Sequence, residues 1–195
     1  MEHVLNVKYA HALRACCEKI NVNAGVFDWE DQNPHTERTK ILGESLQKIR
    51  PKIFISIHFN AKGYADNAPA EVKRRIKQNA YQLKNDAVGT RIYTQLSNKK
   101  WKDFAEKTVI AIHHVRSQRG GGDGSITTPA AGENYGVLQR AKGAGVQSAF
   151  LVEMGFYDNV DDLLWCSKHE NIYAICQAMA EVIRGELPPT STSTS

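Results

Sequence analysis

Residues 54–61 read FISIHFNA, a mostly apolar stretch that closes on His58 and Asn60. Five of its first six residues are Phe, Ile or Ser, and this composition is typical of a buried central strand. Open α/β sheets place their chemistry at the carboxyl ends of such strands. The sequence therefore makes His58 a candidate metal ligand at the end of a central strand.

Helical and strand-like patterns alternate along the chain. Apolar residues at helical spacing predict helices over residues 4–20, 36–49, 101–115 and 169–186. Apolar runs predict strands over residues 52–58, 89–96, 135–139 and 149–156. This alternation indicates an α/β fold in which a mixed, mostly parallel sheet is flanked by helices.

The length of 195 residues suits a single domain with a sizeable core. We expect this domain over residues 1–187, with an insertion at 62–88 that contains a strongly basic helix. Residues 188–195, rich in Ser and Thr, are expected to form a low-complexity tail or linker.

Composition argues against several classes of protein. The net charge of +4 is too mild for a dedicated nucleic-acid-binding protein. No apolar run reaches the roughly 18 residues needed to cross a bilayer, and no secretory signal is expected after Met1. The four cysteines form no C-x-x-C pair and are expected to be buried free thiols.

Glu153 lies inside a second apolar strand, AFLVEMGF at residues 149–156. A buried carboxylate without a partner is costly and tends to become neutral. Two interpretations remain open from the residues alone. Glu153 is either a satisfied structural residue or a carboxylate beside a metal or beside a water that it deprotonates.

Several segments together resemble one family. FISIHFNA resembles the SIHxNA signature of the zinc-dependent N-acetylmuramoyl-L-alanine amidases, the Amidase_3 family, and LVEMGFYDN at 151–159 is similar to its LVExGFxSN segment. EHVLNVKYAHAL at 2–13 resembles its ExxLNLxxAxxL helix, and residues 133–153 parallel its stretch ending VLR…PAVLVE. VDDLLW at 160–165 matches the acidic, Leu-containing run that follows there. These matches occur in the family's order and cover most of the chain.

The resemblance implies a zinc hydrolase that cleaves the amide bond between N-acetylmuramic acid and L-alanine in peptidoglycan. It places Zn²⁺ on His58 and Glu2 together with one further His, and leaves the fourth position to water, the pattern of a catalytic zinc. It makes Glu153 the general base. Asn60 either orients the site or the substrate or is a turn residue after the strand.

One zinc ligand of the family has no counterpart in the sequence. The family's first zinc His precedes the ExxLN helix, and here that helix begins at Glu2. Three explanations remain open: the N-terminal strand is missing, a nearby His (His3, His11 or His35) substitutes, or zinc and activity have been lost. The last would leave a catalytically inactive wall-binding module with an incomplete zinc site, and a different zinc hydrolase is a further alternative.

The expected partner is peptidoglycan, with no nucleic acid and no membrane, and we expect a monomer. The basic residues at 73–77 and Lys84 are either a solvated helix face or a contact to an anionic cell wall. We expect the protein to act on the cell wall, either as a phage endolysin released from the cytoplasm or as a bacterial autolysin.

Overall fold

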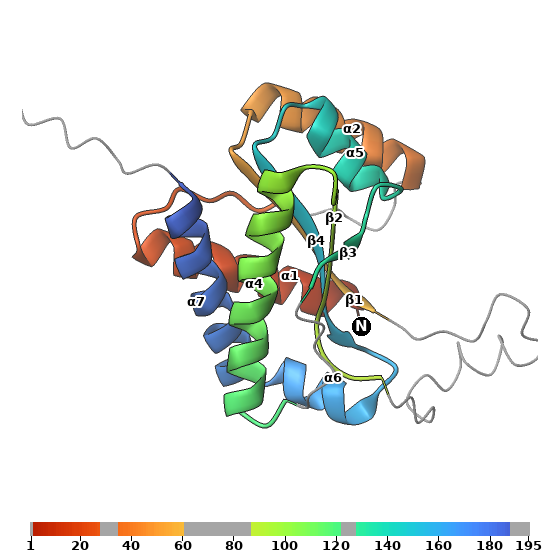
Figure 1. The fold of residues 1–195 in the computed structure, drawn as a ribbon. Coiled ribbons are helices and arrows are strands. Elements are labelled where there is room, and N and C mark those ends of the chain that lie inside the picture. The colour runs from red at the N-terminus through yellow and green to blue at the C-terminus, as the bar shows by residue number, and fades with distance from the viewer. Residues whose placement is uncertain (1, 28–34, 61–86, 122–127, 188–195) are drawn as a thin grey trace, which may run out of the picture.

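The computed structural model describes residues 2–27, 35–60, 87–121 and 128–187 (Figure 1). In this part of the chain, four strands form one sheet in the order β1-β4-β2-β3. Their bounds are β1 Ile53–Asn60, β2 Arg91–Thr94, β3 Ala130–Ala131 and β4 Ser148–Phe156. The β1–β4 and β2–β3 pairs are parallel and the β2–β4 pair is antiparallel, which confirms the predicted mixed, mostly parallel sheet.

Helices cover both faces of this sheet (Figure 1). On one face lie α1 (Glu2–Lys19), α4 (Lys99–Gln118) and α7 (His169–Glu186). On the other lie α2 (His35–Ile49) and α5 (Gly136–Gly143). The short helix α6 (Val160–Ser167) follows β4 directly. The predicted single-domain α/β fold is thus confirmed.

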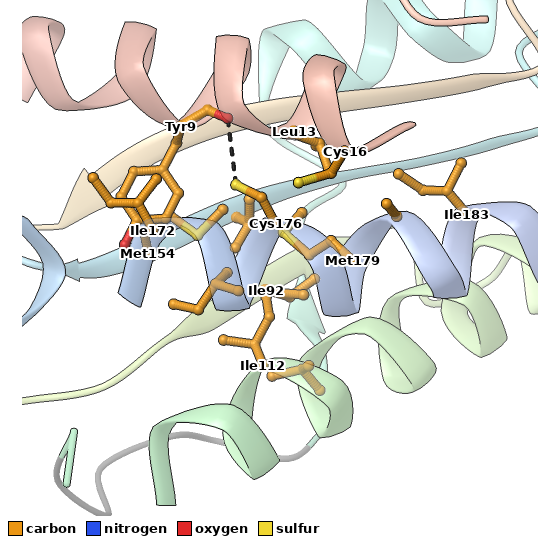
Figure 2. Packing of buried hydrophobic residues seen from close by; sticks show 14 of the residues in the cluster. Tyr9, Leu13, Cys16, Ile92, Ile112, Met154, Ile172, Cys176, Met179 and Ile183 are labelled. Carbon is orange, nitrogen blue, oxygen red and sulfur yellow. Dashed lines mark hydrogen bonds between the residues drawn. The ribbon is translucent and has the colours of Figure 1, made fainter. Parts of the chain in front are cut away.

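The alternation of side chains along β4 separates two buried clusters. Phe150, Val152 and Met154 face α1, α4 and α7, whereas Ala149 and Leu151 face α2 and α5. Figure 2 shows the larger cluster, in which α7 buries the inward side chains predicted for it. They are Ile172, Ile175, Cys176, Met179 and Ile183.

The predicted strand at residues 135–139 is wrong, because these residues belong to α5 and to the turn before it. Leu138 and Ala141 are both fully buried, and their three-residue spacing places them on one side of a helix. A five-residue segment with so few apolar residues cannot by its period be assigned to strand or helix, and here it continues into a helix that packs on α2. The helix α6 and the two-residue strand β3 were not predicted.

Predictions on two segments cannot be compared with the structure. Residues 61–86 and 188–195 lie outside the described ranges, so the insertion, its basic helix and the tail remain predictions. None of the helices in the described part of the chain is long and apolar enough to cross a bilayer.

The four cysteines are free and buried, as expected. Burial raises the pKa of the Cys17 thiol to about 11, and burial also raises that of Cys166 to about 12. The pKa values of Cys16 and Cys176 are raised by burial as well. Because the thiolate is the reactive species, these thiols should be inert in the folded protein.

We therefore expect no fast reaction of the folded protein with a disulfide reagent such as DTNB at about pH 8. After unfolding in guanidinium, all four thiols should react. The measurement is the number of thiols per chain that react in each condition, read from the absorbance of the coloured thiolate that DTNB releases. One or more thiols that react at once in the folded protein would contradict the buried placement.

Candidate active site

His58 and Glu153 lie side by side at the carboxyl ends of the two parallel strands. Their Cα atoms are register partners across β1 and β4, and Glu153 is in turn the register partner of Arg91 across β4 and β2. Directly paired residues project to the same face of a sheet, and neighbouring strands are about 4.8 Å apart. His58, Glu153 and Arg91 therefore form one polar row across three strands.

The helices on this face cover the other end of β1 and β4. The cluster beneath α2 and α5 contains Ala149 and Leu151, with Phe54 and Tyr93 packed against it. Ala149, Leu151 and Phe54 come before the polar row along β1 and β4. Tyr93 is the register partner of Leu151, so it lies on the same side of the row. In Figure 1, α2 and α5 accordingly lie over the half of the sheet where β1 and β4 begin. The polar row is at the opposite half, where the chemistry of parallel strands is usually found.

A hydrogen bond within β1 orients the imidazole of His58. Its Nε2 lies 3.0 Å from Oγ of Ser56, two residues earlier on the same face. When Nε2 carries the proton, it donates to the Ser56 hydroxyl, and the lone pair of the neutral ring is then on Nδ1. Metal-binding imidazoles are commonly oriented by such a hydrogen bond from the second ring nitrogen.

The register shifts by one residue just after the polar row. His58 pairs with Glu153, but Asn60 pairs with Phe156, so β4 contains one more residue than β1 between these two pairs. This β-bulge brings Phe156 to the same face as Asn60. Asn60, which is predicted to bind the substrate, therefore lies at the end of β1, two residues after His58. Its backbone oxygen accepts a hydrogen bond from Tyr157 N at 3.0 Å.

The start of α1 approaches the site from the opposite face of the sheet. Tyr9 packs edge-on against Phe59, with ring centroids 5.6 Å apart, so the first half of α1 lies against the carboxyl end of β1 (Figure 1). Glu2 is the first residue of this helix, two turns before Tyr9. The side chain of Glu2 lies outside the description, so its role as a metal ligand remains a prediction.

The histidines considered as substitute ligands lie differently. His11 is exposed and follows Tyr9 by two residues, which places it about 200° around the helix from the side that packs on the sheet. His3 is also exposed, and the side chain of His35 is outside the description. In the residues that the structure describes, no group of three or more His, Cys, Asp or Glu side chains could hold a metal ion. The third ligand is thus not identified.

A buried ion pair fixes the backbone immediately after Glu153. Asp162 and Arg116 are paired, and both side chains are fully buried. Oδ2 of Asp162 accepts a hydrogen bond from Phe156 N at 2.8 Å, and Nη1 of Arg116 donates to the Met154 oxygen at 3.2 Å. Both backbone groups that flank Gly155 are therefore held by side chains from α4 and α6.

Gly155 leaves the room that this arrangement needs. A Cβ at this position would lie 2.7 Å from Sγ of Cys166 and 2.9 Å from Oδ2 of Asp162. Any larger residue would push α6 away from β4. The glycine of the LVEMGF segment thus allows the close approach that places Glu153.

Sequence reasoning missed three side chains around the row: Arg91, Tyr93 and Tyr135. The rings of Tyr93 and Tyr135 pack at a tilted angle, with centroids 5.1 Å apart. Burial raises the pKa of Tyr135 above its usual value, with smaller contributions from Tyr93 and the Glu153 carboxylate. The signal was present in RIYT, where Arg91 and Tyr93 alternate with the buried Ile92 and Thr94.

In this α/β sheet the parallel strands β1 and β4 carry a paired imidazole and carboxylate near their carboxyl ends, side chains that hydrolases commonly use for acid–base chemistry. The family model for N-acetylmuramoyl-L-alanine amidases, Amidase_3, matches residues 1–185. The chain belongs to this family. The family resemblance predicted from the sequence is confirmed.

Solved structures of amidases have the same fold. N-acetylmuramoyl-L-alanine amidase from Clostridium difficile 630 is 16% identical, with 95% of this chain and 83% of that chain covered and a TM-score of 0.64. AmiC2 of Nostoc punctiforme is 19% identical, with 94% and 83% covered and a TM-score of 0.63. The catalytic domain of the CD27L endolysin targeting Clostridia difficile is 16% identical, with 94% and 83% covered and a TM-score of 0.66. A comparison with curated proteins gives no match.

Proposed function

We propose that this chain is a zinc-dependent hydrolase of the amide bond between N-acetylmuramic acid and L-alanine in peptidoglycan. Membership of the amidase family supports the reaction. The observation that carries the proposal for the site is the direct pairing of His58 with Glu153 across β1 and β4. This pairing supports a site in which a metal-binding imidazole and a carboxylate base act on one substrate carbonyl.

His58 and Glu2 would hold the zinc ion. The fit rests on the imidazole of His58, which lies at the end of β1 and is oriented by the Ser56 hydroxyl. The Glu153 carboxylate beside it is kept for the base. When bound, zinc lowers the pKa of its water towards about 7 and polarises the amide carbonyl. A third ligand from the protein completes this type of site.

Glu153 is the general base in this proposal. Its carboxylate takes a proton from the attacking water as the water oxygen bonds to the carbonyl carbon. The carbon–nitrogen bond then breaks, and Glu153 returns the proton to the leaving nitrogen of L-alanine. Arg116 and Asp162 hold the backbone at Met154 and Phe156 by hydrogen bonds. These bonds keep the Glu153 carboxylate beside His58 during both proton transfers. Asn60, at the end of β1, orients the substrate.

We further propose that the chain acts in the cell wall, outside the cytoplasm, as an endolysin or an autolysin. Peptidoglycan is its only substrate in this account. We also propose that the chain acts as a monomer.

Product analysis tests the proposed reaction. Purified cell walls incubated with the protein should lose turbidity and gain free amino groups on L-alanine, without new reducing ends on the glycan. Removal of zinc with a chelator should stop the release, and added zinc should restore it. Binding to walls with no release of amino groups would contradict the proposal and would identify a wall-binding module instead.

A further inference from the structure

Arg91 reaches from the polar row to the end of the strands. Its Cα is level with that of Glu153, but its guanidinium carbon lies 5.1 Å from the ring centroid of Phe156, the last residue of β4. The β-bulge after Glu153 places Phe156 on this same face, opposite Asn60. The guanidinium therefore lies over an aromatic ring at the carboxyl edge of the sheet, and its residue neighbours the proposed base.

The charge of Arg91 has no counter-ion in the described part of the chain. Among the described residues no ion pair with Arg91 is found, and its buried Nε has no hydrogen-bond partner. Arg116 shows the contrast, because its terminal nitrogens bond to Asp162 and to the backbone oxygens of Met154 and Gly121. Arg116 is thus a structural arginine, whereas the half-buried Arg91 keeps its donors for another group.

We propose that Arg91 binds a carboxylate on the peptide side of the substrate. The inference rests on the proposed function, and its reasoning is chemical. The carboxyl group of muramic acid is consumed in the amide bond, so an anion close to the scissile bond must come from the peptide. The planar guanidinium has N–H donors in a fixed fork, the arrangement that binds a carboxylate at two points.

Arg91 and Glu153 have separate roles in this inference. The two residues are paired through their backbones but form no described ion pair. The Glu153 carboxylate is therefore not neutralised by a direct contact to Arg91. The arginine is a specificity-determining residue, and Glu153 and His58 perform the chemistry.

Two muropeptides that differ in one group test the inference. In one, the residue after L-alanine has a free carboxylate, and in the other this carboxylate is amidated. We expect the wild-type protein to cleave the free form with a kcat/KM at least about tenfold higher, as the loss of a charge-assisted contact predicts. Equal kcat/KM for both would overturn the inference and leave the proposed function intact. If the protein cleaved neither muropeptide and also released no amino groups from purified walls, the proposed function itself would be overturned.

Variants at position 91 assign the preference to this side chain. Arg91→Gln should lower kcat/KM for the carboxylate substrate about tenfold and leave the amidated substrate unchanged. Arg91→Lys, which keeps the charge without the two-point geometry, should fall between Arg91→Gln and wild type. Arg184→Gln, an exposed arginine on α7, is the matched control and should change neither value. An equal loss for both substrates in Arg91→Lys and Arg91→Gln would overturn the inference, because it would show a general role in the site.

Discussion

Glu153→Gln should lower the rate of amide hydrolysis by about 10²–10⁴-fold, because the amide cannot take a proton from water. The substitution preserves size and shape, and the strand around it is fixed by Arg116 and Asp162. The fold should therefore remain, with an unchanged thermal midpoint. The measurement is the release of amino groups from purified walls, at equal protein concentration.

A matched control separates the loss of the base from a general change in charge. Glu181 is exposed on α7 and pairs only at the surface with Arg184. Glu181→Gln should retain full activity, since it removes the same charge far from the row. If Glu153→Gln hydrolysed walls at the wild-type rate, Glu153 could not be the general base.

Asp162→Ala should be the most destabilising single substitution, with a loss of about 3–5 kcal/mol in the free energy of unfolding. It leaves the fully buried Arg116 without its carboxylate partner. It also removes the acceptor for the backbone N–H groups of Phe156 and Gly89. The helices α4 and α6 and the strand β4 would lose the side chain that joins them.

Urea denaturation measures this effect against an exposed ion pair of the same kind. Arg14 and Glu18 on α1 are about half exposed, so Glu18→Ala should cost at most about 1 kcal/mol. The double variant Arg116→Met with Asp162→Leu should recover part of the loss, because no unpaired charge remains buried. A cost for Asp162→Ala as small as that of Glu18→Ala would show that the network does not stabilise the fold.

The strongly periodic segments were predictable from sequence, and the relations between them were not. The apolar runs before His58 and around Glu153 predicted strands, and the pattern of α7 predicted its inward side chains correctly. That His58 and Glu153 are direct neighbours depends on the register of β1 with β4, which joins residues 95 positions apart. No local sequence pattern encodes the register of two strands so far apart in the chain. Only the family resemblance therefore linked His58 with Glu153 before the structure was known.

The failures also have physical causes. α5 was predicted as a strand because its apolar residues are too few to show a period. Asp162 was read only as part of an acidic run, although its burial depends on Arg116 in a helix 46 residues earlier. Arg91 was overlooked because the alternation in RIYT indicates that Arg91 and Tyr93 share one face of the strand, but not that this face borders the site.

Zinc retention in three purified proteins tests the central claim most directly, namely that His58 binds the metal and its neighbour Glu153 serves as the base. The wild-type protein and Glu153→Gln should both retain about one zinc ion per chain against the same concentration of chelator. His58→Ala should lose its zinc under these conditions. Loss of zinc from Glu153→Gln as readily as from His58→Ala would contradict the account, because it would make Glu153 a ligand.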